Sequence, residues 1–314
     1  MKNMINTIIG TFLICSTSAA YALIANSPTI INNTVDSALI NLAETTLPES
    51  TTANPEFLNT DYDPYLSLHH NANVYVSFLD EGAGYKNSLG YFTFNDDTFS
   101  GLNKGSIDTD SSGVVSLSEL GAVEGIEYGF LFANLSKSGS GGSLLTGDTV
   151  QVGDSAIALE KNVSFFLSQN SYAGGDTVSD GILTGTDQTF YGLDFLNPEA
   201  DFTYENGSSS ATSRHVAMLF TDNNEEQVIM GFEDLNRVNP SSNDWSIPSD
   251  EDFNDAIFMV YSDPVDAFSN SNIATAPLPP MAQSLFGLMM CAGLILITQK
   301  NSILIPLKNT NLST

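Results

Sequence analysis

Between residues 73 and 262 the chain alternates short runs of β-branched and aromatic residues with clusters of Gly, Asn, Asp and Ser. Runs of this kind, bounded by turn-forming residues and without a helical period, are typical of antiparallel strands. The expected strands lie at 74–78, 90–94, 128–132, 149–152, 163–167, 215–220, 227–232 and 256–261. The pattern therefore predicts an all-β fold, an antiparallel β-sandwich or jelly roll, over residues 73–262.

Acidic residues are concentrated in the central part of the sequence. The whole chain has 37 Asp and Glu against nine Lys and Arg, a net charge of −28. All 37 acids and only six of the bases lie within residues 23–280, which gives this part a net charge of −31. Such a segment repels phosphate backbones, so the sequence excludes a nucleic-acid partner. A hydrophobic content of 42% is too high for an acidic disordered chain.

The first 22 residues have the features of a secretory signal peptide. Lys2 precedes an apolar stretch at 4–15, and small residues stand at Ala20 and Ala22, so cleavage is expected after Ala22. Residues 23–72 are rich in Asn, Thr, Ser and Ala, and we interpret them as a polar, partly disordered leader. The sequence thus predicts an exported protein of the cell envelope, the cell surface or the extracellular space.

A second apolar stretch, residues 281–298, contains no charge and is near the lower limit for a bilayer-spanning helix. It follows a linker at 263–280 and precedes a short tail at 299–314 that carries Lys300 and Lys308. Residues 276–280, Ala-Pro-Leu-Pro-Pro, resemble the Val-Pro-Leu-Pro-Ala box of PEP-CTERM-type sorting tails. That resemblance implies processing by an exosortase-type enzyme. Ala276, Pro280 and the absence of an Arg cluster depart from it, so a plain transmembrane anchor remains the alternative.

Cysteine is confined to the two terminal segments, as Cys15 and Cys291. Disulfide bonds therefore cannot stabilise the part of the chain between these segments. Its many carboxylates suggest a divalent cation, Ca²⁺, in that role.

One twelve-residue segment, 108–119, has the spacing of an EF-hand calcium loop. Gly113 stands where the loop must turn sharply, and Val115 where an apolar residue packs beneath it. The expected ligands, at loop positions 1, 3, 5, 7, 9 and 12, are Asp108, Asp110, Ser112, the Val114 carbonyl, Ser116 and Glu119. The two glycines in 99–107 make a poor entering helix, so we expect an isolated calcium loop inserted between strands. The alternative is a solvated turn.

A second acidic group adjoins two predicted strands. Glu233 and Asp234 follow the strand at 227–232, and Asp250, Asp252 and Asp255 precede the strand at 256–261. Like charges crowded in this way repel one another unless they are screened, and a bound cation relieves that repulsion. These five residues are therefore predicted metal ligands, with a hydrated acidic turn as the alternative.

Several blocks, in order over about 74–260, resemble the family called domain of unknown function 4114. They include 74–85 (Val-Tyr-Val-Ser-Phe-Leu-Asp-Glu-Gly-Ala-Gly-Tyr), 231–234 (Gly-Phe-Glu-Asp) and 250–255 (Asp-Glu-Asp-Phe-Asn-Asp). The resemblance implies a β-rich domain of secreted or surface bacterial proteins, often with adhesin or PEP-CTERM features. Its biochemical role is undefined. From the expected strand ends, we hypothesise that Glu81 joins the second acidic group.

These observations favour an exported, non-catalytic calcium-binding protein of the surface or extracellular matrix, acting in adhesion, biofilm or surface assembly. The expected partners are extracellular polysaccharide or other surface proteins, and the membrane through the C-terminal helix. A calcium-dependent carbohydrate-binding module is the main alternative. A secreted hydrolase is a weaker one, because no nucleophile-elbow motif is present and His69-His70 has no partners at zinc-ligand spacing.

Overall fold

The computed structural model describes residues 21–23, 28–179, 188–201, 213–237 and 249–276. The chain divides into two compact units, Met1–Ala274 and Thr275–Thr314, and the account below concerns the first. The expected C-terminal helix at 281–298 and most of the signal segment lie outside the described residues. Within the described part, no helix has the length and apolarity needed to cross a membrane.

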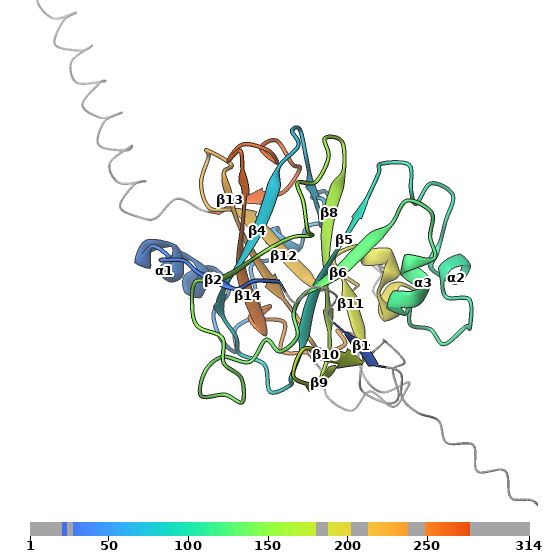
Figure 1. The fold of residues 1–314 in the computed structure, drawn as a ribbon, viewed down its shortest axis with the longest axis horizontal. Helices are drawn as coiled ribbons and strands as arrows, with labels where there is room; N and C mark the ends of the chain where they lie inside the picture. The colour runs from blue at the N-terminus through green and yellow to red at the C-terminus, as the bar shows by residue number, and fades with distance from the viewer. Residues whose placement is uncertain (1–20, 24–27, 180–187, 202–212, 238–248, 277–314) are drawn as a thin grey trace, which may run out of the picture. The chain divides into compact units, whose positions relative to one another are not determined.

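Two antiparallel sheets form the layers of a sandwich (Figure 1). The larger sheet has the order β15 (Ala274–Thr275), β12 (Val216–Phe220), β13 (Gln227–Phe232), β14 (Ala256–Asp263), β4 (Asn73–Asp80), β7 (Asp148–Gln151) and β2 (Ile31–Asn32). The smaller has the order β11 (Thr189–Tyr191), β8 (Asn162–Ser168), β5 (Ser88–Phe94) and β6 (Glu127–Phe132), with β3 (Leu66–Ser67) paired to β8. A third, small sheet joins β1 (Tyr21–Leu23), β10 (Thr177–Ser179) and β9 (Tyr172–Gly174). The predicted all-β class is confirmed.

The main core lies between the two large sheets. Alternate residues of β4, Val74, Val76 and Phe78, are fully buried there, as the period of two along a strand requires. The opposite layer contributes aromatic side chains, and the ring of Phe132 stacks on that of Phe258 at a centroid distance of 6.0 Å. Apolar burial across the layers therefore holds the sandwich together.

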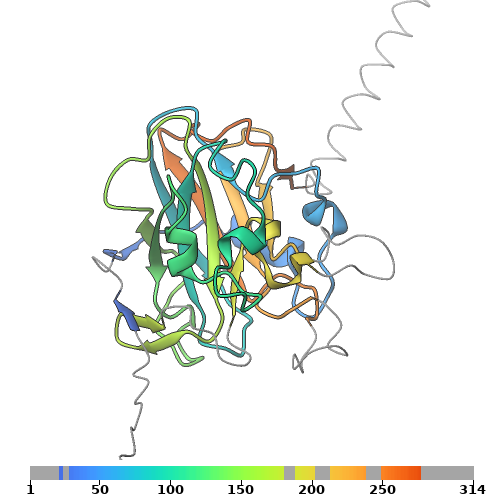
Figure 2. The ribbon, with the colours of Figure 1, turned by 90° about the vertical axis from the view of Figure 1, so that its right-hand side faces the viewer.

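A second core covers the outer face of the smaller sheet. Two short helices, α2 (Lys104–Ile107) and α3 (Leu117–Gly121), flank the segment 108–116, and Figure 2 shows them in front of the strands. Val115, Leu117 and Leu120 are fully buried in one cluster with Phe166 and Tyr191. Because this cluster covers the outer side, every residue of β8 is buried.

The segment expected as a polar leader contains regular structure in its described part. Helix α1 (Ser37–Thr46) is capped by Asp36, whose side chain accepts a hydrogen bond from the Ala38 N–H. Leu39, Ala43 and Leu47 are buried, at a spacing of four that places them on one face of the helix. A 3₁₀ turn, η1 (Pro55–Leu58), buries Phe57 and Leu58. Two further 3₁₀ turns, η2 (Asp194–Leu196) and η3 (Pro198–Asp201), follow β11.

Candidate metal sites

The segment 108–119 folds into a closed loop that follows α2 and ends in the first turn of α3. Ser111 and Gly113 have positive φ angles of 59° and 85°, which turn the chain sharply at the position expected for glycine. The Tyr191 hydroxyl donates to the carbonyl oxygen of Val115 at 2.7 Å, and the Val115 side chain is buried beneath the loop. The loop is thus anchored on the sandwich, as the predicted role of Val115 requires.

The three carboxylates of this loop lie together. Oxygens of Asp108, Asp110 and Glu119 lie within 4.8 Å of one another, a spacing suited to a metal ion. Glu119 Oε1 accepts from the Thr109 N–H at 2.7 Å, and Glu119 Oε2 accepts from the Ser116 N–H at 2.9 Å. Glu119 therefore joins the beginning and the end of the loop.

The other three predicted ligands of this loop form hydrogen bonds within it. The Ser112 N–H donates to Asp108 Oδ1 at 3.0 Å, and its hydroxyl donates to the Val114 carbonyl oxygen at 2.9 Å. Ser116 caps helix α3, and its hydroxyl oxygen accepts from the Glu119 N–H at 3.3 Å. Ser112, Val114 and Ser116 thus lie in the loop and shape it.

Hydrogen bonds keep two of these carboxyl groups ionised. Burial raises the pKa of Glu119, but bonds from Ser116 and Thr109 outweigh it and lower the pKa overall. Bonds from Ser112 lower the pKa of the exposed Asp110. The loop is therefore negatively charged at neutral pH and offers oxygen ligands of the kind that Ca²⁺ prefers.

The second group of carboxylates is assembled by the pairing of β13 with β14. Phe232 is opposite Ala256 in the register, so Glu233 and Asp255 are the next residues at the same ends of the two strands. The turn before β14 returns Asp252 to them, with positive φ angles of 64° at Glu251 and 59° at Phe253. Oxygens of Glu233, Asp252 and Asp255 lie within 4.8 Å of one another. We call these three residues the inner group.

The charge and the buried oxygens of the inner group are poorly compensated by hydrogen bonds. Glu233 is fully buried, and its Oε2 has no hydrogen-bond partner, whereas its Oε1 accepts from the Leu235 N–H at 3.1 Å. Asp255 Oδ2 accepts from the Asp234 N–H at 2.8 Å. Burial, with added repulsion from neighbouring carboxylates, raises the pKa of Glu233 to about 8 and that of Asp255 to about 10. Burial also raises the pKa of Asp252.

A third set of carboxylates shares Asp252 with the inner group. It consists of Glu49, Asp250 and Asp252, again with oxygens within 4.8 Å, and Glu49 and Asp250 are exposed. We call it the outer group. Sequence reasoning missed Glu49 because it lay in the presumed leader. The spacing of Leu39, Ala43 and Leu47 was the signal that this segment forms an amphipathic helix.

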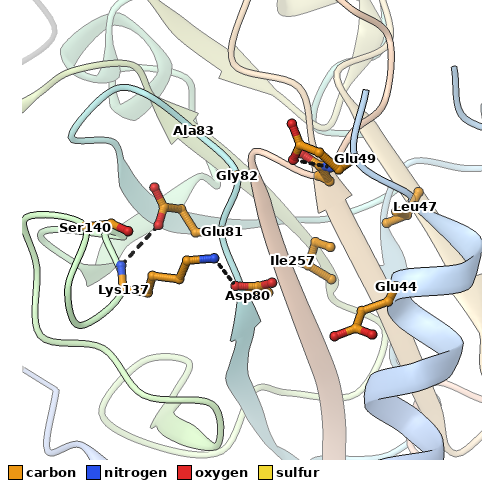
Figure 3. A pocket seen from close by; sticks show the side chains of 11 residues that line it. Glu44, Leu47, Glu49, Asp80, Glu81, Gly82, Ala83, Lys137, Ser140 and Ile257 are labelled. Carbon is orange, nitrogen blue, oxygen red and sulfur yellow. Dashed lines mark hydrogen bonds and ion pairs between the residues drawn. The ribbon is translucent and has the colours of Figure 1, made fainter. Parts of the chain in front are cut away.

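Asp234 and Glu81, both predicted ligands, lie outside these groups. Asp234 Oδ2 accepts from Asn87 Nδ2 at 2.6 Å, and burial raises the pKa of Asp234 to about 6. Glu81 Oε2 accepts from the Lys137 N–H at 3.1 Å, while Lys137 Nζ forms an ion pair with Asp80 at 2.7 Å. Asp80, Glu81 and Lys137 line a cavity of about 460 Å³, which Glu49 also lines. Figure 3 shows how these side chains lie.

The buried His215, which is paired with Glu199, holds the backbone of Glu233 in place. His215 is fully buried and stacks on the ring of Phe190 at a centroid distance of 4.0 Å. Its Nδ1 bonds the carbonyl oxygen of Glu233, and its Nε2 bonds Glu199 Oε1, each at 2.9 Å. The Glu233 N–H donates to the His215 carbonyl oxygen at 3.0 Å. These contacts fix the direction of the Glu233 side chain, and they explain His215 as a structural residue.

Comparison with known proteins gives a family match. Residues 157–263 match the family model described as domain of unknown function (DUF4114), which confirms the resemblance over this range. The range includes the inner group and begins after the loop 108–119. Neither the curated proteins nor the solved structures include a match to this chain.

Proposed function

We propose that this chain, with its DUF4114 match over residues 157–263, is an exported surface protein that binds calcium and has no catalytic activity. One observation carries the proposal: the carboxylates at positions 1, 3 and 12 of the loop 108–119 converge within 4.8 Å. The loop's hydrogen bonds and positive φ angles give it the compact form that a calcium loop requires.

The biological setting of the proposal rests on the sequence. A secretory signal at 1–22 and a sorting or anchoring segment at 281–298 support export and retention at the cell surface. A cysteine-free acidic sandwich gains stability from cations where disulfides cannot supply it. Such a module serves adhesion, biofilm matrix or surface assembly, with polysaccharide or other surface proteins as partners.

The decisive experiment is a calcium titration of the purified full chain, by calorimetry and by thermal unfolding. Bound calcium at about 100 times Kd stabilises the folded state by about 2.7 kcal/mol. For a domain of this size that corresponds to a rise in Tm of about 5–10 °C. Asp108→Asn should lose the loop's share of the binding, and the exposed Asp97→Asn, outside all three groups, should not. Absence of both binding heat and Tm shift in the wild type would refute the proposal.

A second candidate function is calcium-dependent carbohydrate binding. The observation that favours it is the cavity of about 460 Å³, which Glu49 of the outer group lines together with Lys137 and Asn254. An exposed cation with open coordination positions binds vicinal sugar hydroxyls. Retention on an acidic exopolysaccharide column that chelator abolishes would support this candidate, and retention unaffected by chelator would exclude it.

A further inference from the structure

The side chain of Glu233 is difficult to explain by the protein alone. It is fully buried, its Oε2 has no hydrogen-bond partner, and it belongs to the inner group with Asp252 and Asp255. A buried carboxylate oxygen without a partner incurs its full desolvation penalty, which folded proteins rarely tolerate. The position therefore calls for a ligand that the protein atoms do not supply.

The surroundings of the inner group specify the charge of that ligand. The hydrogen bonds that reach its carboxylates come from neutral groups. Backbone N–H groups donate from Leu235 to Glu233, from Asp234 to Asp255, and from Ser50 and Asn254 to Asp252. The Ser249 side chain also bonds Glu233 and partly offsets the rise in its pKa. Arg237 Nη2 forms an ion pair with Glu251 Oε2 at 2.6 Å, and its guanidinium carbon lies 5.0 Å from the centroid of the Phe253 ring. Neutral donors orient the three carboxylates but do not balance their charge, so the ligand that fits is a cation.

We propose that Glu233, Asp252 and Asp255 bind one divalent cation in a buried site separate from the loop 108–119. The set is made of hard carboxylate oxygens and contains no nitrogen or sulfur ligand, which favours Ca²⁺ over a transition metal. The separation of the two sites in the sequence makes this inference independent of the loop, since either site can exist without the other.

Occupancy of this site has a structural consequence for the N-terminal segment. Asp252 Oδ2 accepts from the Ser50 N–H at 2.7 Å, and the Glu251 carbonyl oxygen accepts from the Ala53 N–H at 2.7 Å. A cation on Asp252 fixes the turn at 250–255 in its positive-φ conformation and so preserves both bonds. The cation thereby fastens residues 50–53 to the ends of β13 and β14.

The test is the number of calcium ions bound per full-length chain, measured after dialysis by atomic emission and by calorimetry with CaCl₂ alone. Glu233→Gln keeps the shape of the side chain and removes its charge, and it should lower the number by one. Asp108→Asn should leave the ion at Glu233 in place, and Asp97→Asn should change nothing. An unchanged number in Glu233→Gln, or a wild type whose calcium is lost entirely in Asp108→Asn, would overturn the inference while leaving the loop proposal intact.

A second measurement does not depend on the folding of the Glu233 variant. In the Asp108→Asn protein, added calcium should slow hydrogen exchange at the amides of Ser50 and Ala53 at least tenfold. Exchange rates at these amides that do not change when calcium is added would count against the buried site. Calcium protection in this variant would support the buried site, and the loop proposal is tested separately by the loss of binding between the wild type and Asp108→Asn.

Discussion

At the scale of single residues, the acidic side chains fall into two classes with opposite effects on stability. Asp110 and Glu119 have lowered pKa values, because hydrogen bonds favour their ionised forms. Glu233 and Asp255 have pKa values raised to about 8 and 10, chiefly by burial. In an unfolded chain a Glu or Asp titrates near 4. The buried pair therefore binds more protons in the folded state than in the unfolded state between pH 4 and pH 8.

This difference predicts how the cation-free protein responds to pH. A raised folded-state pKa stabilises fully below the unfolded pKa, near 4, and the stabilisation is lost as pH rises through about 8 for Glu233 and about 10 for Asp255. Urea unfolding in chelator should therefore show stability falling from pH 6 to pH 9. Each carboxyl group that is protonated only in the folded state contributes a fall of about 1.4 kcal/mol per pH unit. Glu233→Gln should flatten the profile, and stability that rises over this range would contradict the assignment.

At the scale of elements, the strand ends that hold the inner group need very close packing. Gly231 in β13 has no room for a side chain, because a Cβ there would lie 2.3 Å from the Phe253 carbonyl oxygen and 2.4 Å from Leu47 Cδ1. The glycine thus lets both the turn at 250–255 and the end of α1 lie against the sheet. A single backbone position links the turn at 250–255 to the N-terminal helix.

We predict that Gly231→Ala destabilises the fold by about 1–3 kcal/mol, because the turn must move away from β13 to relieve the overlap. The matched control is Gly84→Ala, since Gly84 has no atom within 4 Å of the added Cβ and its φ is not positive. The control should stay within about 0.5 kcal/mol of the wild type. Urea unfolding of both variants in excess calcium measures the difference, and equal stabilities would disprove the packing argument.

The elements also show what a sequence can predict for this fold. Long strands with apolar alternation were found within a few residues: 227–232 is Gln227–Phe232, and 163–167 lies within Asn162–Ser168. The two-residue strands β2 and β3 were missed, because a period of two needs more residues to be visible. Helix α1 was missed because the polar average composition of residues 23–72 hid the apolar spacing of Leu39 and Ala43 in the helix and of Leu47 at its C-cap.

The candidate sites were predictable where their ligands are close in sequence or lie next to predicted strands. The members of the loop 108–119 lie within twelve positions, so their spacing specified them. Glu233 and Asp255 were predicted because they adjoin two predicted strands, which pair in the structure. The position of Glu49 near the acidic turn depends on the end of α1 lying against β13. The Asp234 carboxylate is not part of the inner group and accepts a hydrogen bond from Asn87 of another segment. Contacts of this kind follow from packing, which the local pattern does not contain.

At the scale of the whole molecule, repulsion acts between acids throughout the chain, whereas the proposed cation sites are local. Residues 23–280 have a net charge of −31, and self-repulsion of that size weakens any compact state. Monovalent salt at 0.1 M largely screens the repulsion between surface charges that are more than about 10 Å apart, but it has little effect on carboxylates buried as deeply as Glu233. The two contributions can therefore be separated by comparing ions at one ionic strength.

We predict that NaCl and CaCl₂ at equal ionic strength raise the Tm of the cation-free chain by different amounts. NaCl relieves only the general repulsion, whereas calcium also binds the loop 108–119 and the inner group, so its effect should be larger by at least about 5 °C. A double variant, Asp108→Asn with Glu233→Gln, keeps most of the surface charge and should respond to both salts alike. Scanning calorimetry of the wild type and the double variant in each salt measures these Tm values. If CaCl₂ still raises the Tm of the double variant more than NaCl does, the stabilisation comes from acids outside both sites.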